Sequence, residues 1–293
     1  MGNKGLVYVN GRCHPPEKAR VSALDRGFLF GFGVFETMRA YGGVIFLLER
    51  HLERLEQSAA LTGIPLPHTA GEFERILYKV IMKSGVSEAY LRLIVTPGAG
   101  QPVPAAGEKI APTVVIICRP VPAPPEKVYR KGVEAIVAGS KKVPASSLDP
   151  RIKSHSYLPN VLARAEAVRA GAHEAFLADS DGFLTEGAMS SVFVVKGGAL
   201  MTPPLEAGIL EGTRRGEILR LAGEAGIKVR EKPIRIRRIF SADECFFTTA
   251  VVEVMPVVRL DGRPVGPGRP GPLTKKVHKL LRKSIAGYCK NRR

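Results

Sequence analysis

The chain has 293 residues, of which 45% are hydrophobic and 24% charged, with 31 glycines and 23 prolines. At ~150 residues per domain this length predicts two domains, and the composition excludes collagen-like, coiled-coil and disordered proteins. The 44 Lys and Arg against 27 Asp and Glu give a net charge of +17, which favours anionic ligands.

Neither a membrane segment nor a metal site is predicted. The longest apolar run, residues 114–118, is far shorter than the ~20 residues of a membrane-spanning helix, and the N-terminus lacks the apolar region of a secretory signal. Cys13, Cys118, Cys245 and Cys289 stand far apart, without zinc-binding spacing. We therefore expect a cytoplasmic protein with free thiols and no bound metal.

The first part of the chain predicts an α+β domain over residues 1–119. Its hydrophobic patterns and its Asn-Gly and Gly-Gly turns indicate strands at 6–10, 34–41, 44–48, 89–98 and 113–120, and helices at 48–64 and 73–85. Four prolines within residues 120–125 predict a linker, followed by a larger domain over 126–293.

The second part alternates strands with helices. Strands are indicated at 133–139, 174–179, 191–203 and 245–265, and helices at 158–171 and after the Gly-Thr turn within 208–227. The last nineteen residues contain no acidic residue, and we expect them to form a solvated, fraying helix. Without a zinc-finger spacing or an RNA-recognition aromatic signature, we do not expect a nucleic-acid partner despite the charge.

Three features with possible chemistry are each ambiguous alone. Gly212 and Thr213 precede a helix, where backbone amides favour a phosphate but also form ordinary caps. Lys153 precedes a helix, where a buried amine forms Schiff bases, although most lysines are simply exposed. Glu186 lies in a turn before a strand, and its carboxylate suits a heterocyclic nitrogen.

Five segments in order change this interpretation: HLERL (51–55), KSHSYL (153–158), TEGAMSSVF (185–193), GILEGTRR (208–215) and TTAVVEVMPV (248–257). Their order and intervals resemble the class IV pyridoxal-phosphate enzymes of fold type IV. This group contains branched-chain aminotransferases, D-amino-acid aminotransferases and aminodeoxychorismate lyases. The resemblance implies a two-domain α+β or α/β fold, similar to D-amino-acid aminotransferase, with pyridoxal 5'-phosphate between the domains.

The resemblance also implies roles for single residues. Lys153 matches the lysine that forms the internal aldimine and shuttles a proton between substrate Cα and cofactor C4′. Glu186 matches the carboxylate that keeps the pyridine nitrogen protonated, and Arg54 matches the arginine on the phosphate. Tyr157 matches a tyrosine near the phenolic oxygen of the cofactor.

Two turns match the remaining phosphate contacts. Gly212, Thr213 and Arg214 form the first turn, in which GTRR replaces the usual G-I/V-T-R and moves the hydroxyl back by one residue. Arg214 is therefore expected to contribute its backbone amide. Thr249 and Ala250 fall in the second turn, where Ala250 offers only backbone.

The choice of family member rests on fewer residues. FETMR (35–39) differs from the FEGIR of branched-chain enzymes, and Pro97 replaces the carboxylate-binding arginine of D-amino-acid enzymes. Residues 24–41 and KSHSYL look most like bacterial aminodeoxychorismate lyases of folate biosynthesis, which release 4-aminobenzoate and pyruvate. That activity is our expectation. The alternative is an aminotransferase acting on branched-chain or D-amino acids with 2-oxoglutarate.

An anionic amino substrate requires a cation, and Arg92 is the candidate, with Phe30 and Phe35 as apolar walls. Because family members are commonly homodimers, we expect a homodimer, with residues 98–110 as the candidate loop that closes the site. A basic binding protein that has lost catalysis on this fold is a further alternative. The joint presence of Lys153, Glu186 and Arg54 argues against it.

Overall fold

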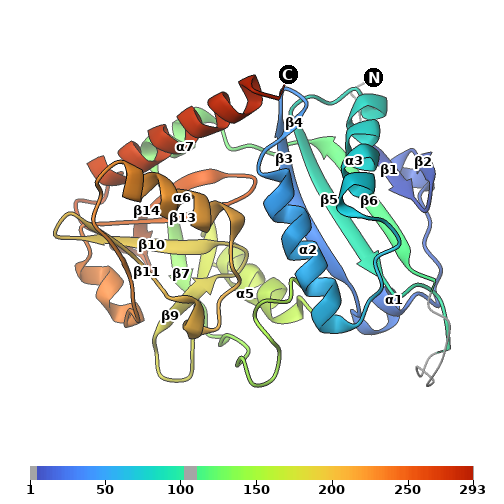
Figure 1. Cartoon of the computed structure of the whole chain (residues 1–293). Helices are drawn as coiled ribbons and strands as arrows, with labels where there is room; N and C mark the ends of the chain where they lie inside the picture. Colours follow the sequence, from blue (N-terminus) through green and yellow to red (C-terminus); the bar gives the residue numbers. More distant parts are fainter. Residues whose placement is uncertain (1–4, 102–110, 293) are drawn as a thin grey trace. The chain divides into compact units, whose positions relative to one another are not determined.

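The computed structural model of the chain describes residues 5–101 and 111–292. The chain forms two compact units (Figure 1), of which the first contains Met1–Pro122, Arg151–Tyr157 and Ile285–Arg293 and the second contains the rest. The first unit thus includes the segment with Lys153, which the sequence-based boundary assigned to the 126–293 domain. That boundary stays a proposal. Most of the candidate closing loop, residues 102–110, lies outside the described residues.

Among its described residues, the first unit contains one six-stranded sheet and three α-helices. The strand order is β2-β1-β6-β5-β3-β4, and every pairing is antiparallel. The strands are β1 (Leu6–Val9), β2 (Arg12–His14), β3 (Val34–Tyr41), β4 (Val44–Ile45), β5 (Ala89–Thr96) and β6 (Thr113–Pro120). The helices are α1 (Arg26–Phe30), α2 (Leu48–Thr62) and α3 (Ala70–Ser84), and η1 (Pro16–Lys18) is a short 3-10 turn.

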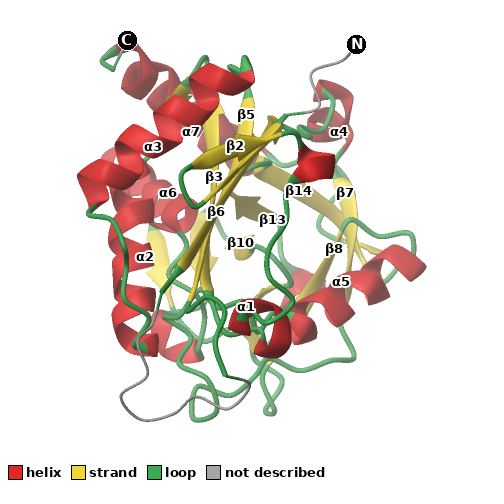
Figure 2. Cartoon of the chain, turned by 90° about the vertical axis from the view of Figure 1, so that its right-hand side faces the viewer, coloured by secondary structure: helices red, strands yellow, loops and turns green. Residues whose placement is uncertain are grey.

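The two faces of this sheet differ. Alternate residues of β3, β5 and β6, among them Met38, Leu91 and Ile116, pack with α2 and α3 in an apolar core; Figure 2 shows both helices on one side of the sheet. The intervening residues point to the opposite face, because side chains alternate along a strand. Phe35 and Arg92 lie on that opposite face, as the cross-strand register shows.

The first unit largely follows its sequence pattern. Helix α2 ends at Gly63, whose positive φ of 69° suits a glycine cap. Helix α3 begins earlier than expected, because Thr69 and Glu72 form a reciprocal capping box. Strand β4 is shorter than the expected 44–48, and the sequence pattern did not predict α1.

The second unit is built on a nine-stranded sheet in its described residues. The order is β12-β11-β10-β13-β14-β7-β8-β9, with β15 paired to β14. The strands are β7 (Val133–Val137), β8 (Glu174–Ala178), β9 (Leu184–Gly187), β10 (Ser191–Lys196), β11 (Ala199–Thr202), β12 (Val229–Glu231), β13 (Glu244–Thr249), β14 (Glu253–Leu260) and β15 (Arg263–Pro264). The helical segments are α4 (Glu126–Lys131), α5 (Leu158–Arg169), η2 (Leu205–Ala207), α6 (Thr213–Glu224), η3 (Ile236–Ser241) and α7 (Pro272–Lys290), of which α7 belongs to the first unit from Ile285 onward.

The expectation of a solvated, fraying C-terminal helix is wrong. In α7 the apolar residues Val277, Leu281 and Ile285 recur every four residues and are buried. Glu244 accepts the first-turn amides of Leu273 and Thr274 at 3.0 and 2.7 Å, which caps the helix. The basic residues therefore occupy only the outer side of a packed amphipathic helix.

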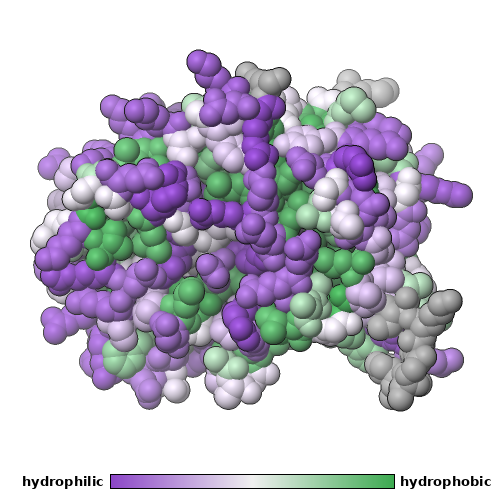
Figure 3. Space-filling model, in the orientation of Figure 1, coloured by the Kyte–Doolittle hydropathy of each residue, from purple (hydrophilic) through white to green (hydrophobic). Residues whose placement is uncertain are grey.

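The surface has mixed polarity. Figure 3 shows hydrophilic residues over most of the viewed face, with small hydrophobic patches between them. No helix in the described residues is long and apolar enough to cross a membrane. The four cysteines are free thiols.

Candidate functional site

Lys153 lies on a short extended segment that adds to the edge of β3. The amide of Phe35 donates to the carbonyl of Lys153 at 3.0 Å, and the amide of His155 donates to the carbonyl of Gly33 at 2.8 Å. On its other side, the amide of Lys153 donates to Oγ of Ser58 in α2 at 3.1 Å. The backbone of Lys153 is thus held by both a strand and a helix of the first unit.

Four side chains surround the ring of Phe35. Nζ of Lys153 lies 4.6 Å and the guanidinium carbon of Arg92 lies 3.8 Å from the ring centroid. The rings of Tyr157 and His155 lie at centroid distances of 5.5 and 5.6 Å. The first unit therefore gathers Lys153, Tyr157, Arg92 and Phe35 at one place.

Phe30 is not part of this cluster. Its side chain is 53% exposed on α1, and no described aromatic contact joins it to Phe35. Its assignment to the substrate site remains a prediction without a contact to support it in the described residues.

Arg54 belongs to a buried charged cluster on the helix side of the same sheet. Its Nε and Nη2 donate to the two carboxylate oxygens of Glu36 at 2.7 and 2.8 Å. Nδ1 of His51 lies 2.6 Å from the same carboxylate. Burial alone would raise the pKa of Glu36, but the charges and hydrogen bonds of Arg54 and His51 lower it to about 2. The guanidinium is consequently held in one orientation.

Glu186 lies on β9 in the second unit and is nearly buried. One carboxylate oxygen accepts the amide of Leu210 at 3.2 Å, and the other forms an ion pair with Lys142. Lys142 is itself fixed, because its amide donates to the carbonyl of Ala178 at 3.0 Å. This arrangement keeps the carboxylate in place and balances its charge.

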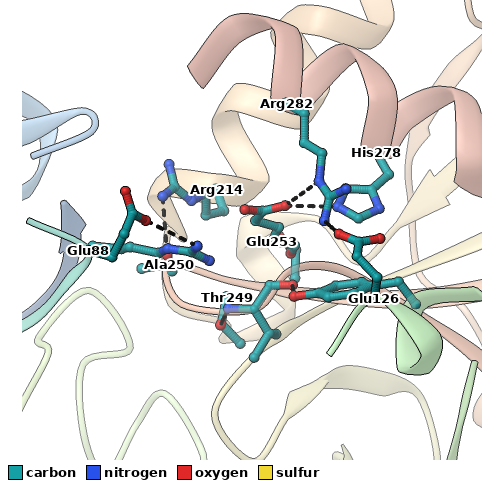
Figure 4. Close-up of polar contacts among 12 residues, drawn as sticks. Glu88, Glu126, Arg214, Thr249, Ala250, Glu253, His278 and Arg282 are labelled. Carbon is teal, nitrogen blue, oxygen red and sulfur yellow. Dashed lines mark hydrogen bonds and ion pairs between the residues drawn. The ribbon is translucent and has the colours of Figure 1, made fainter. Parts of the chain in front are cut away.

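The two turns expected to bind phosphate are joined within the second unit. Arg214, in the first turn of α6, donates from Nη2 to the carbonyl of Ala250 at 3.1 Å (Figure 4). Thr249 shapes the second turn, since its Oγ1 accepts the amides of Val251 and Val252 at 3.1 and 3.0 Å. The side chain of Arg214, whose role the sequence left open, therefore braces the neighbouring turn.

The N-terminus of α6 leaves no room for a side chain at Gly212. A Cβ built there would lie 2.6 Å from Oγ of Ser191, and glycine provides no side-chain cap for the helix. Such a helix start presents backbone amides and a positive dipole end to an anion. In the first unit, the amine of Lys153 suits an aldehyde and Arg54 suits a phosphate. In the second unit, the start of α6 suits a phosphate and Glu186 suits a ring nitrogen. These are the groups that pyridoxal phosphate contains.

The open face of the first sheet contains a cavity of about 470 Å³. Its walls are mainly apolar and include Phe28, Ile94, Val115 and Ile117. His155 contributes a polar group, and burial together with the charge of Arg92 lowers its pKa to about 4, although Asp25 opposes this shift. At neutral pH the imidazole is therefore uncharged.

Sequence reasoning missed Glu36, His51, Ser58 and Lys142. The first three had a detectable signal: Glu36 interrupts the otherwise apolar row of alternate residues in β3, and His51 and Ser58 follow the helical spacing of Arg54. Lys142 had no such signal, because it lies in a segment without helix or strand, where no periodic pattern marks a buried position. No group of three or more His, Cys, Asp or Glu that could hold a metal occurs in the part of the chain that the structure describes.

Comparisons with known proteins identify the family. The family model "Amino-transferase class IV" matches residues 33–260. The chain is 39% identical over 271 residues to the "Putative branched-chain-amino-acid aminotransferase" of Methanocaldococcus jannaschii, covering 92% of this chain and 93% of that protein. It is 37% identical over 279 residues to the "D-alanine aminotransferase" of Bacillus licheniformis, covering 95% and 96%.

Comparison with solved structures leads to the same family. The branched-chain aminotransferase of the archaeon Thermoproteus uzoniensis with norvaline superposes with a TM-score of 0.88 at 32% identity, covering 97% of this chain and 95% of that one. The Escherichia coli branched-chain aminotransferase gives a TM-score of 0.89 at 31% identity, covering 94% and 93%. Another superposable branched-chain aminotransferase structure, with a TM-score of 0.91 at 30% identity, contains pyridoxamine 5'-phosphate.

These findings overturn the expected aminodeoxychorismate lyase activity and its place in folate biosynthesis. The similar proteins are named as branched-chain and D-alanine aminotransferases, in line with the alternative expectation. The lyase expectation rested on two short segments, residues 24–41 and 153–158, and the second contains Lys153 and Tyr157, which the resemblance assigns to the cofactor and not to the substrate. The chain belongs to the class IV aminotransferases, which are pyridoxal-phosphate-dependent transaminases of fold type IV.

Proposed function

We propose that this protein transfers the amino group of branched-chain L-amino acids to 2-oxoglutarate. The support is that similar proteins and superposable structures are named as branched-chain aminotransferases. In the overall reaction the donor exchanges its amino group for the oxygen of the 2-oxo acid. The products are a branched 2-oxo acid and glutamate.

Each cofactor residue has a defined task in this proposal. When bound, pyridoxal phosphate supplies an aldehyde that condenses with amines and a ring that accepts electrons from the substrate carbon. Lys153 would hold the cofactor through its amine and would carry a proton to and from the substrate Cα. Arg54 in the first unit and the start of α6 in the second are each candidates for the phosphate, and Glu186 would keep a proton on the ring nitrogen.

The cavity of the first unit supports an apolar donor. Its aliphatic walls at Ile94, Val115 and Ile117 suit a branched side chain, since burying such a chain gains ~1.5–3 kcal/mol. The same sheet face holds Arg92, whose guanidinium suits the second carboxylate of 2-oxoglutarate. An apolar cavity and an arginine on the same sheet face would serve both substrates in turn.

We also propose a homodimer, supported by exposed apolar side chains. On α5 these are Leu158, Val161, Leu162 and Val168, between 47% and 67% exposed. Such side chains mark contact surfaces when they gather on one element. Sedimentation should give a dimer mass for the wild type and a monomer mass for Leu162→Asp. A monomeric wild type would contradict the proposal.

We also propose a cytoplasmic location, with which the free thiols are consistent.

The substrate assignment is tested by product analysis. Loaded enzyme is incubated with 2-oxoglutarate and either L-leucine or D-alanine, and glutamate is quantified on a chiral column. The proposal predicts L-glutamate with L-leucine as donor. D-glutamate formed only with D-alanine would instead assign the enzyme to the D-amino acids, an outcome that the 37% identity to a D-alanine aminotransferase makes worth measuring.

A further inference from the structure

Helix α2 has a buried row of polar residues on its core side. His51, Arg54 and Ser58 are 0%, 9% and 0% exposed, although the face around them consists of leucines and alanines. Residues three and four apart share one face of a helix. The same side of α2 therefore contains the phosphate-binding candidate Arg54 and, one turn later, the hydroxyl of Ser58.

Ser58 contacts backbone groups of both Arg151 and Lys153. Its Oγ accepts the amide of Lys153 at 3.1 Å and donates to the carbonyl of Arg151 at 3.5 Å. The carbonyl of Lys153 is held separately by the amide of Phe35. Through its two contacts, the hydroxyl of Ser58 links α2 directly to the backbone of the Lys153 segment.

We propose that Ser58 is a positioning residue that sets the location of Lys153 relative to Arg54. The inference rests on the proposed function, in which Arg54 holds the phosphate and Lys153 bonds the aldehyde. In one molecule of pyridoxal phosphate these two groups have a fixed separation. Arg54 and Ser58 are four residues apart on a rigid helix, ~6 Å along its axis, so α2 acts as a spacer between the two contacts.

Loss of the Ser58 hydroxyl should affect the geometry of the Lys153 segment more than its stability. Loss of the hydroxyl leaves the amide of Lys153 without this acceptor, a destabilisation of modest size in a small segment. A displacement of ~1 Å at a reacting group, however, lowers rates by ~100-fold. Removing the hydroxyl should therefore slow steps that need Lys153 while leaving phosphate binding intact.

Three variants test the proposal. Ser58→Ala removes the hydroxyl, and Ser58→Thr keeps it. Thr62→Ala is the matched control: it removes a hydroxyl one turn later on the same helix, where Oγ1 donates only to the helix carbonyls of Ser58 and Ala59 at 2.8 and 3.1 Å. Thermal unfolding of the cofactor-free proteins verifies that each variant folds.

Two readouts separate positioning from general structure. Pyridoxamine 5'-phosphate cannot condense with a lysine, so its affinity reports the contacts to the phosphate and the ring without the bond to Lys153. The rate at which the visible band develops after pyridoxal phosphate is added reports the attack by Lys153. For Ser58→Ala we expect this rate and kcat to fall ~10–100-fold, with pyridoxamine phosphate affinity within ~2-fold of wild type.

Hydrogen exchange supplies a measurement on the cofactor-free protein. In Ser58→Ala, residues 151–157 should exchange faster than in wild type, and in Ser58→Thr and Thr62→Ala they should not. Unchanged band formation in Ser58→Ala, or a parallel loss of pyridoxamine phosphate affinity, would overturn the proposal. If wild-type Lys153 never develops the band, the proposed function itself fails, which is a separate result.

Discussion

Nζ of Lys153 lies over the ring of Phe35, 4.6 Å from its centroid. The guanidinium of Arg92 lies 3.8 Å from the same centroid, so one aromatic side chain contacts both the candidate amine and the candidate carboxylate-binding group. Phe35 is 2% exposed and belongs to β3, and its own amide donates to the carbonyl of Lys153. It therefore orients the two groups together.

Replacing Phe35 by leucine should impair turnover with both substrates. Leucine keeps an apolar side chain but loses the flat surface on which Lys153 and Arg92 rest, and we expect kcat/KM to fall ~10-fold in steady-state kinetics. Phe46→Leu is the control, because Phe46 is equally buried but packs against Tyr41 and Tyr288. A parallel loss of kcat/KM in that control would mean that Phe35 acts through stability alone.

Arg92→Gln should discriminate between the two substrates. The proposed contact with the second carboxylate of 2-oxoglutarate predicts a KM for this acceptor at least ~10-fold higher, since a charge-assisted pair contributes ~1.5–3 kcal/mol. The half-reaction with L-leucine should change little. Arg119→Gln offers the comparison: this exposed arginine also stacks on a ring, that of Tyr90, at 4.7 Å. If KM for 2-oxoglutarate stays constant, another cation binds the acceptor.

Arg214→Met should weaken cofactor binding. Methionine loses the hydrogen bond to the carbonyl of Ala250, which braces the second turn, and one such bond corresponds to ~10-fold in the Kd of pyridoxal phosphate. Equilibrium dialysis or fluorescence titration measures this constant. Arg220→Gln, an exposed position later in α6 that pairs with Glu217 and Glu224, should leave it unchanged. Equal affinity in wild type and Arg214→Met would exclude a bracing role.

Glu36→Gln should change the pH dependence of stability. The pKa of Glu36 is about 2 in the folded protein against an ordinary value of 4.5. Its ionised form therefore stabilises the fold above pH 4.5 by ~3 kcal/mol, and this contribution disappears as the pH falls from 4.5 towards 2. Urea unfolding at several pH values should give a higher free energy of unfolding for the wild type than for Glu36→Gln. This difference should decrease below pH 4.5.

The control for this measurement is Glu88→Gln, an exposed carboxylate that accepts the amide of Gly42. Its effect on the free energy of unfolding at pH 7 should stay within ~0.5 kcal/mol. If the free energy of unfolding of the wild type exceeds that of Glu36→Gln by the same amount at pH 3 and pH 7, the carboxylate does not stabilise the fold through its charge.

Local patterns predicted much of the fold. Runs rich in apolar and β-branched residues predicted β5 and β6, and leucines at helical spacing predicted α2, because these signals are local in the sequence. The prediction for α7 is wrong because net charge does not show which face is buried, and the lysines leave room for the apolar repeat Val277, Leu281 and Ile285. The short α1 and α4, with five and six residues, are too brief to produce a periodic signal.

The candidate site was predictable only in part. Motif order located Lys153, Arg54 and Glu186, but the groups that hold them depend on contacts far apart in the sequence. Glu36 and Arg54 are 18 residues apart, and Lys142 and Glu186 are 44 apart. The cavity on the open sheet face was not predictable, because Ile94 and Val115 resemble ordinary core positions in the sequence.

The most direct test of the account is to find the lysine that bonds the cofactor. Enzyme loaded with pyridoxal phosphate is reduced with borohydride, digested, and mapped by mass spectrometry, with Lys153→Ala treated in parallel. The account predicts that the reduced cofactor is attached to the peptide containing Lys153 and that the variant carries none. Attachment at another lysine, or equal labelling of Lys153→Ala, would contradict it.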